Sequence, residues 1–323
     1  MEDDAGQAQA HPSRTAKVQE GQVVLPDGRK LTYLAAGSTR GLPLFHFHGH
    51  GSSRMEALVL DKAARAAGIS VWAFDRPGIG GSDPCPGDCL GNWPMDVFAA
   101  ADQLGIQRFL VQGMSAGAAY ALACADHDPQ RIIACSLVSP LPPPPIIRRS
   151  GPILRRWFWW MAARFPNFLE KRLQQIRPDV ELTPDRFTKR LRFLEPWLGG
   201  EDHNLLKNPE IMQIFARSLQ ESTRQSNAAN RRELLRLAQP WGFDQKAISV
   251  PLFLWHGEQD RIVLPQSVRR WLLELPGCQS QFYAKDGHFS VLALRSEAIL
   301  QTLQSMSCRG IVPLSPRTNT DRF

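Results

Sequence analysis

The residues best suited to chemistry lie around position 115, in the run Gly113-Met114-Ser115-Ala116-Gly117. The run places a serine between two glycines, directly after the apolar segment Phe109-Leu110-Val111. This G-x-S-x-G spacing is typical of a tight turn from a strand into a helix, because its flanking positions have no room for large side chains. Such a turn leaves the serine strained and exposed, so we predict that Ser115 is a nucleophile.

A serine needs a base, and the later sequence supplies a histidine and an acid. Asp260 follows the apolar segment Pro251–Trp255, and His288 follows Gln279–Ala284, so each comes just after a candidate strand. The carboxyl ends of strands are where catalytic groups gather in open α/β sheets. We therefore predict a triad in which His288 moves the Ser115 proton and Asp260 fixes the imidazole tautomer.

Two other acids, Glu258 and Asp286, compete with Asp260 for this role. A lone histidine is usually a solvated or core residue, and a loop aspartate usually forms a turn. The order Ser, Asp, His, with each residue after a strand, favours the triad over these structural roles.

Acyl transfer also needs hydrogen-bond donors for the oxyanion. The strand-like segment Leu42–Phe47 runs into the glycine-containing loop His48–Ser53, and one donor in such sites follows the nucleophile. We expect the backbone amides of His50 and Ala116 to be the two donors.

The same loop region holds alternate histidines. Zinc binding by His46, His48 and His50 is an alternative, but the set lacks a nearby cysteine or a suitably spaced acid. We expect His46 and His48 to pack or brace the loop, and we expect no metal or cofactor.

These motifs together resemble the α/β-hydrolase fold superfamily, as an esterase-like member with a helical cap. The resemblance extends from Val23 to about Met306 and rests on His48-Gly49, Asp75–Asp83, the turn around Ser115, Asp260 and His288. It implies that Asp75–Asp83 is a structural loop and that a serine nucleophile serves ester or thioester chemistry. The chain departs from the superfamily's His-Gly-x-Pro-Gly-Ser pattern, with Gly51 in place of the proline and Ser52 in place of the glycine. A loop without proline is less constrained.

The rest of the chain alternates apolar runs with helical patterns. We predict an α/β fold with a mostly parallel sheet of about eight strands flanked by helices, and an antiparallel hairpin around Leu25–Lys30. The predicted strands lie near residues 42–48, 70–75, 108–114, 132–138, 250–256 and 279–284, and the predicted helices near 54–67, 95–104 and 116–126.

About a hundred residues without a convincing strand interrupt this pattern after a proline-rich hinge, Pro140–Pro145. Periodic apolar residues there, such as Phe187, Leu191, Phe193 and Leu194, predict several helices. In the superfamily, an insertion at this place is a lid. The expected organisation is a disordered tail (1–21), a catalytic domain (22–143 and 248–308), a helical cap (144–247) and an irregular C-terminal tail (309–323).

The insertion also holds the basic excess of the chain. Residues 146–247 contain 19 Lys or Arg and 11 Asp or Glu, whereas the remainder contains 19 and 20. The cations alternate with acids along helices, which favours a solvated face over a nucleic-acid surface. One or two of Arg148, Arg149, Arg155 and Arg156 are candidates for contact with an anionic substrate group.

The aromatic run Arg156–Met161 surrounds most of a helix, so its rings must face different neighbours. Core packing is the simplest role, and a pocket, a partner or transient attachment to anionic lipid are alternatives. Trp157 and Trp160 are candidates for contact with substrate, together with Gly49 and Met114 beside the nucleophile.

Composition is consistent with a globular protein of 323 residues. The polar N-terminus lacks the features of a secretory signal and no apolar stretch could span a bilayer, so we expect a cytoplasmic protein without stable membrane insertion. All six cysteines are expected to be reduced, with a Cys85–Cys89 disulfide as a minor alternative. Cys124 and Cys135 are expected to be buried.

The sequence thus predicts a serine hydrolase that cleaves a small to medium apolar carboxylic ester or thioester through an acyl-enzyme. Alternatives that keep the same triad are hydrolysis of a carbon-carbon bond, a lactone or a peptide, and acyl transfer. A non-catalytic ligand receptor is the alternative from another class. Substrate identity and oligomeric state are not encoded in any motif.

Overall fold

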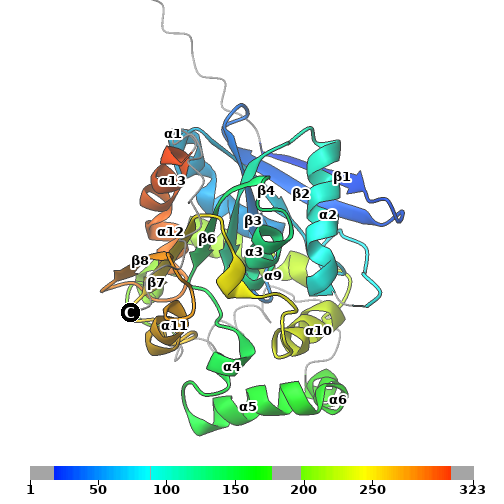
Figure 1. The fold of residues 1–323 in the computed structure, drawn as a ribbon, viewed down its shortest axis with the longest axis vertical. Coiled ribbons are helices and arrows are strands. Elements are labelled where there is room, and N and C mark those ends of the chain that lie inside the picture. The colour runs from blue at the N-terminus through cyan, green and yellow to red at the C-terminus, as the bar shows by residue number, and fades with distance from the viewer. Residues whose placement is uncertain (1–17, 88, 177–197, 307–323) are drawn as a thin grey trace, which may run out of the picture.

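The computed structural model describes residues 18–87, 89–176 and 198–306, with the side chains of residues 89 and 176 left aside. An eight-stranded sheet runs through the molecule in the order β1-β2-β4-β3-β5-β6-β7-β8 (Figure 1). Strands β3 to β8 run parallel to one another, whereas β2 is antiparallel to both of its neighbours, β1 and β4. The predicted fold class, a mostly parallel sheet of about eight strands, is confirmed.

The strands follow the apolar runs closely. Their bounds are β1 (Gln19–Val24), β2 (Lys30–Gly37), β3 (Leu42–Phe47), β4 (Ile69–Phe74), β5 (Phe109–Met114), β6 (Ile132–Val138), β7 (Leu252–Gly257) and β8 (Gln279–Tyr283). The β1–β2 hairpin turns at Gly28, whose φ of 87° favours glycine. Strand β1 begins at Gln19, so the sheet reaches into the last residues of the expected N-terminal tail; residues 1–17 lie outside the described part.

Helices cover both faces of the sheet. They are η1 (Arg54–Leu60, a 3₁₀ helix), α1 (Asp61–Ala67), α2 (Cys89–Gln103), α3 (Gly117–His127), α11 (Pro265–Leu272), α12 (Ser290–Leu294) and α13 (Ser296–Ser305). Alternate side chains of one strand enter opposite cores: Phe109 and Val111 pack with α2 and α3, whereas Leu110 packs with η1, α1 and α13. The helix predicted at 95–104 begins earlier, at Cys89, and contains Pro94.

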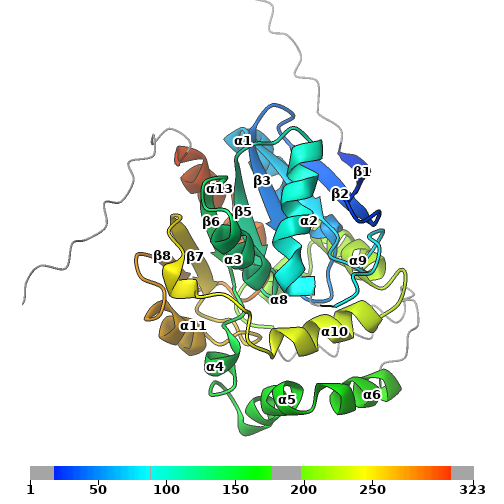
Figure 2. The ribbon, with the colours of Figure 1, turned by 45° about the vertical axis from the view of Figure 1, so that its right-hand side comes forward.

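An insertion of helices separates β6 from β7. Its described elements are α4 (Pro144–Ile147), α5 (Ile153–Arg164), α6 (Pro166–Ile176), α8 (Asp202–Leu205), α9 (Pro209–Ser222), α10 (Ala228–Leu237) and the 3₁₀ helix η3 (Gln245–Ala247). Helix α9 packs on η1 and α10 packs on α6, while α5 and α6 form the outermost layer at the bottom of Figures 1 and 2. The helical pattern predicted around Phe187 and Leu194 lies outside the described residues.

Two of the predicted buried thiols are found in the core. Cys124 in α3 and Cys135 in β6 are fully buried, and burial raises the pKa of both thiols. The structure does not describe the side chain of Cys89 or any part of Cys308. No helix within the described ranges has the length and apolar character needed to span a bilayer.

Candidate active site

Ser115 occupies a strained turn between β5 and α3. Its φ of 53° lies in the left-handed region, which among the described non-glycine residues it shares only with Ser139. A Cβ atom at Gly113 would collide with the Gly117 carbonyl, and one at Gly117 would collide with the Phe47 carbonyl. Only glycine fits on either side, so neighbouring backbone encloses the turn and holds a conformation that costs about 1–3 kcal/mol.

The segment after β6 joins this turn to the loop that contains His288. The N–H of Leu141 donates to the carbonyl of Ser115 at 3.0 Å, and the Ser139 hydroxyl donates to the carbonyl of His288 at 2.8 Å. The N–H of Ser139 in turn donates to Trp255 at the end of β7. Three loops that are distant in sequence therefore share one set of hydrogen bonds at the carboxyl edge of the sheet.

His288 pairs with Asp260 across this edge. Its Nδ1 lies 2.7 Å from Oδ2 of Asp260, and both side chains are buried. The second carboxylate oxygen, Oδ1, accepts the N–H groups of Ile262 and Val263 at 2.8 Å each. The carboxylate is thus fixed by its own loop, and the tautomer that donates from Nδ1 leaves Nε2 of His288 as an acceptor.

The charge around His288 alters its basicity. Burial lowers the pKa of His288, but Asp260, by its charge and its hydrogen bond, and the charges of Asp202 and Glu56 outweigh burial, so that the pKa lies above its usual value. Behind Asp260, burial lowers the pKa of His256 to about 4, and its Nε2 lies 3.0 Å from the Val263 carbonyl. His256 is therefore neutral near pH 7 and supplies no competing charge.

The two rival acids are engaged elsewhere. Asp286 is buried and pairs with Arg295 at 2.7 Å, and Glu258 pairs with Arg269 on the surface. Neither forms a hydrogen bond with His288 in the described part of the chain, so the geometry favours Asp260 among the three acids.

An aspartate of the insertion, Asp202, holds the histidine loop from the other side. Its buried carboxylate accepts the N–H groups of His288, Phe289 and Ser290 at 2.7, 3.0 and 2.8 Å. A Cβ atom at Gly287 would collide with this carboxylate, so the contact also depends on a glycine. Sequence reasoning missed Asp202, because no local pattern links it to a loop 86 residues away.

Residues 48–53, which the sequence suggested as the source of one oxyanion donor and which we call the oxyanion loop, lie against Ser115. A Cβ at Gly49 would lie 3.6 Å from Cβ of Ser115, and its N–H already donates to Glu56. By contrast, the N–H groups of His50 and Ala116 donate to no described residue. These are the two amides that the sequence suggested as oxyanion donors.

An ion pair between core and insertion braces this loop. The buried Arg76 guanidinium donates to the carbonyls of His48 and Gly49 and pairs with Glu233 of α10. The other Glu233 oxygen lies 2.9 Å from Nδ1 of His50. Burial raises the pKa of Glu233, but Arg76 and His50 outweigh burial and lower it to about 2, so Glu233 is ionised near neutral pH.

Two serines of α9 complete the bracing. The Ser218 hydroxyl accepts the N–H of Ser53 at 2.9 Å, and the Ser222 hydroxyl donates to the carbonyl of Gly51 at 3.1 Å. The loop lacks the proline of the superfamily pattern, and α9 and α10 supply polar contacts to it instead. Glu233, Ser218 and Ser222 gave no signal in the sequence.

The other histidines of this region have partners of their own. Nε2 of His46 lies 3.0 Å from Glu56, and Nδ1 of His48 lies 2.9 Å from the Gly49 carbonyl. Burial lowers the pKa of His48 well below its usual value, so it is neutral. Within the described residues, no group of three or more His, Cys, Asp or Glu side chains has a geometry suited to a metal ion.

The candidates for substrate contact separate into two groups. Gly49 and the buried Met114 lie beside Ser115. Trp157 and Trp160 are 55% and 49% exposed on α5, whereas Trp159 between them is buried. Such exposure places Trp157 and Trp160 on the outside of the insertion, because side chains that line a closed pocket are largely removed from solvent.

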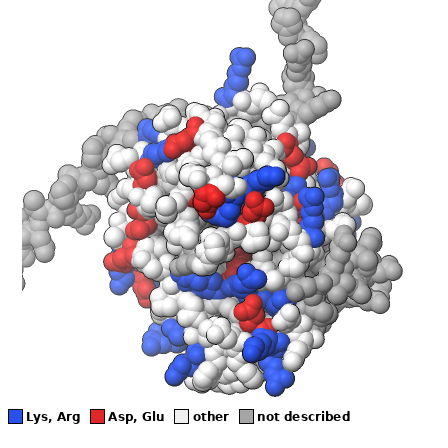
Figure 3. Space-filling view, turned by 90° about the vertical axis from the view of Figure 1, so that its right-hand side faces the viewer, with Lys and Arg blue, Asp and Glu red and all other residues white. Residues whose placement is uncertain are grey.

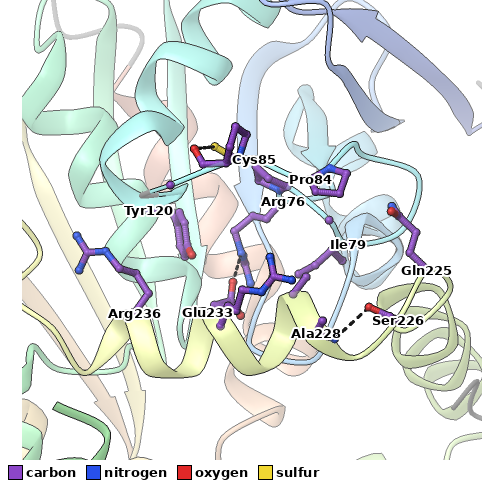
Figure 4. Close-up of a pocket in the computed structure, with 16 residues that line it drawn as sticks. Arg76, Ile79, Pro84, Cys85, Tyr120, Gln225, Ser226, Ala228, Glu233 and Arg236 are labelled. Carbon is purple, nitrogen blue, oxygen red and sulfur yellow. Dashed lines mark hydrogen bonds and ion pairs between the residues drawn. The ribbon is translucent and has the colours of Figure 1, made fainter. Parts of the chain in front are cut away.

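A cavity of about 310 Å³ is lined by both members of the Arg76–Glu233 pair (Figure 4). Glu233 and Arg236 rise into it from α10, and Tyr120 and Ile79 contribute apolar surface. Ser115, Asp260 and His288 do not line it. The cavity therefore adjoins the ion pair that braces the oxyanion loop rather than Ser115.

Comparison with known proteins identifies the family of this chain. Residues 44–302 match the alpha/beta hydrolase family, which is most of the chain. The chain belongs to the alpha/beta hydrolase family. As an alpha/beta hydrolase it is an enzyme. The matched range contains the turn at Ser115, the loop of His288 and the inserted helices.

Solved structures share the fold of this hydrolase at low identity. An esterase from Thermogutta terrifontis with malate bound is 18% identical, with a TM-score of 0.67 over 89% of this chain and 99% of that one. The enol-lactonase from Burkholderia xenovorans LB400 is 16% identical, with a TM-score of 0.63 over 90% of this chain and 100% of that one. At this identity the likeness concerns the fold alone.

Among curated proteins, the chain resembles the dihydrolipoyllysine-residue acetyltransferase component of the acetoin cleaving system from Pseudomonas putida. The two are 34% identical over 114 residues, which is 35% of this chain and 30% of that protein. The counterpart from Cupriavidus necator is 35% identical over 117 residues. The hydrolase thus matches less than a third of the length of these relatives.

Proposed function

We propose that this alpha/beta hydrolase is a serine esterase that cleaves apolar carboxylic esters or thioesters through an acyl-enzyme formed on Ser115. One observation carries the proposal: the strained turn at Ser115 is tied through Ser139 to the loop of His288, and His288 pairs with Asp260 at 2.7 Å. A nucleophile, a base and an acid that orients the base are the parts that acyl transfer requires.

In the first step, Oγ of Ser115 attacks the carbonyl carbon of the ester while Nε2 of His288 takes the hydroxyl proton. The new C–O bond turns the carbonyl oxygen into an oxyanion, which the N–H groups of His50 and Ala116 receive. The tetrahedral intermediate then collapses. The C–O bond of an ester or the C–S bond of a thioester breaks, and the imidazolium returns the proton to the leaving alcohol or thiol.

In the second step, water attacks the acyl-serine and the same groups act in the same order. His288 takes a proton from the water, the carboxylic acid leaves, and Ser115 regains its proton from the imidazolium. Asp260 stabilises the imidazolium in both steps because its charge lies beside Nδ1. Atoms and charges balance without a cofactor.

The preference for apolar acyl groups rests on the side chains around this edge. Met114 adjoins Ser115, and the half-buried Phe289 packs edge-on against the His288 ring at 5.1 Å and against Phe215 of α9 at 5.4 Å. An apolar wall of this kind favours a hydrocarbon acyl or leaving group over a charged one. Trp157 and Trp160, which the sequence suggested as candidates for substrate contact, are exposed on α5 and are not part of this wall.

Two experiments test the proposal. A fluorophosphonate probe is expected to label the wild-type enzyme and the variant Ser305→Ala, an exposed serine on α13, but not Ser115→Ala. Labelling that persists in Ser115→Ala would contradict the nucleophile. In a chain-length series of nitrophenyl esters we expect kcat/KM to rise from acetate to longer acyl groups; a preference for acetate alone would contradict the apolar wall.

The same experiments separate the alternatives. A labelled protein that turns over no ester, lactone or thioester would indicate a ligand receptor built on the hydrolase fold. If an added alcohol diverts most of the acyl group from water, the enzyme is an acyltransferase with the same site. In both cases Ser115 keeps its assignment and only the fate of the acyl group changes.

A further inference from the structure

Helices α5 and α6 present an unusual outer face. Their exposed large apolar side chains, with the exposed fraction of each, are Ile153 (75%), Leu154 (75%), Trp157 (55%), Trp160 (49%), Phe165 (43%) and Phe168 (51%). On α5, Ile153, Leu154, Trp157 and Trp160 recur at helical spacing. The Trp160 ring lies 5.9 Å from the Phe165 ring between the two helices, and Phe168 follows on α6, so the six side chains form one continuous face. We refer to these six residues as the apolar face.

This concentration is not a property of the whole surface. Eleven large hydrophobic side chains are exposed among the described residues, and six of them belong to the apolar face. Single exposed apolar side chains are ordinary on a soluble protein, but a contiguous cluster marks a contact surface.

The two helices are anchored firmly on their inner side. Trp159 and Ala162 are buried, and the Ala162 carbonyl accepts a hydrogen bond of 3.1 Å from the Gln239 side chain. The Arg155 guanidinium donates to the carbonyls of Arg261 and Ile262 in the loop of Asp260. The outer side chains are therefore held outward by a fixed helix.

Cations surround the apolar face. Arg156, Arg164, Lys171 and Arg172 are exposed, and only Glu170 opposes them on these helices. The Arg164 guanidinium lies 5.2 Å from the Phe165 ring centre, and Arg172 lies 5.4 Å from that of Phe168. In Figure 3, blue side chains flank white surface at the lower end of the molecule.

We infer that the apolar face docks on an anionic lipid bilayer, with the six apolar side chains below the headgroups and the four cations at their level. Aromatic rings with arginines beside them suit this boundary, where each ring has an apolar body and each guanidinium meets phosphate. A second copy of the chain fits less well, because apposing two such faces would bring like charges together. The inference does not depend on the proposed esterase activity.

Vesicle cosedimentation with the full chain tests this docking. We expect binding to vesicles of phosphatidylcholine mixed with phosphatidylglycerol, much weaker binding to phosphatidylcholine alone, and a decrease as salt is added. The variant Leu154→Ser/Phe168→Ser should weaken binding at least about tenfold, because it removes two inserted side chains. The control Met95→Ser/Leu273→Ser, exposed apolar side chains elsewhere, should bind as the wild type does.

Charge is tested by a second pair of variants. Arg164→Gln/Lys171→Gln should weaken binding to the mixed vesicles about thirtyfold, since each basic residue near an anionic surface contributes about 1 kcal/mol and about 1.4 kcal/mol corresponds to a factor of ten. The exposed control Arg40→Gln/Lys62→Gln should change it little. Thermal unfolding shows that each variant is folded, and hydrolysis of a water-soluble ester separates a docking defect from a catalytic one.

Three outcomes would overturn the inference: equal binding to neutral and anionic vesicles, equal binding by the variants and their controls, or no binding at all. A concentration-dependent dimer that Leu154→Ser/Phe168→Ser abolishes would assign the face to a second copy instead. Light scattering without lipid detects that case.

Discussion

Helices α8, α9 and α10 turn buried polar side chains toward the catalytic edge, whereas α5 and α6 turn apolar rings and arginines toward solvent. We refer to these as the inner and outer halves of the insertion. The inner half contacts the oxyanion loop through Ser218, Ser222 and Glu233, and the histidine loop through Asp202. The outer half contacts the loop of Asp260 through Arg155, and its helix α6 packs on α10 of the inner half.

The two halves of the insertion thus use their charged residues in different ways. In the inner half the buried Glu233 pairs with Arg76 and the buried Asp202 accepts three backbone N–H groups, because a charge removed from water without a partner is costly. In the outer half Arg156, Arg164, Lys171 and Arg172 are exposed and form no ion pair with another described residue, which leaves them available to an anionic surface outside the molecule. The inner half is therefore expected to govern turnover and stability, and the outer half to govern attachment.

The largest effect is expected from Glu233→Ala. The substitution leaves the buried Arg76 guanidinium without its carboxylate and His50 without its partner, which should lower the free energy of unfolding by about 3–5 kcal/mol. The loosened oxyanion loop should also lower kcat about tenfold or more. Chemical denaturation and ester turnover measure the two effects.

Glu170→Ala is the matched control, because Glu170 is partly exposed and lies 3.7 Å from the exposed Arg232. Its unfolding free energy should change by less than about 1 kcal/mol. Equal losses of unfolding free energy in Glu233→Ala and Glu170→Ala would show that the contacts of Glu233 with Arg76 and His50 do not stabilise the protein more than a surface ion pair does.

A smaller effect is expected from Asp202→Asn. The amide keeps one acceptor oxygen but turns a donor toward the N–H groups of the histidine loop, so His288 loses its position and a nearby negative charge. We expect kcat to fall about tenfold with little change in KM, and the pH midpoint of kcat/KM to move down.

The neighbouring Glu201→Gln serves as a control, because it removes the same charge from a partly exposed side chain that accepts a hydrogen bond from Asn204 and forms none with the histidine loop in the described part of the chain. It should leave both kcat and the pH midpoint unchanged. If Asp202→Asn lost activity with the midpoint unchanged, Asp202 would have a purely structural role and would not act on the basicity of His288.

A smaller effect is expected in the pH dependence of the wild-type enzyme, which reports the pKa of His288. His288 must be neutral to act as a base, and its pKa lies above 6.5 because Asp260, Asp202 and Glu56 outweigh burial. Activity should therefore be lost as pH falls through a midpoint above 6.5. The stability that the charged His288 gains from these carboxylates has the opposite trend, since it is present at low pH and lost as pH rises through that midpoint.

Profiles of kcat/KM between about pH 5 and 9 measure this midpoint. Glu233, with its pKa lowered to about 2, and His256, with its pKa lowered to about 4, do not titrate in that window. A midpoint clearly below 6.5 would show that the three carboxylates do not dominate the environment of His288.

The catalytic edge was predictable from the sequence because its signals are local. Ser115, Asp260 and His288 each follow an apolar run within a few residues, and parallel strands bring such positions to one edge. Glu233 and Asp202 were not predictable, since their partners lie 157 and 86 residues away and helical periodicity does not say which polar side chain becomes buried. The four consecutive rings after Arg156 raise the same difficulty, because they surround the helix and only packing decides which ring is buried.

The smallest effect on chemistry is expected in the outer half. Leu154→Ser/Phe168→Ser should hydrolyse a water-soluble nitrophenyl ester with kcat and KM within about twofold of the wild type, because exposed side chains outside special contacts rarely change stability by more than about 0.5 kcal/mol. A loss of turnover comparable to that of Asp202→Asn would contradict the separate roles of the two halves, because it would mean that α5 and α6 act on the catalytic edge through α10. Unchanged turnover with reduced vesicle binding would instead show that one insertion divides catalysis and attachment between its two halves.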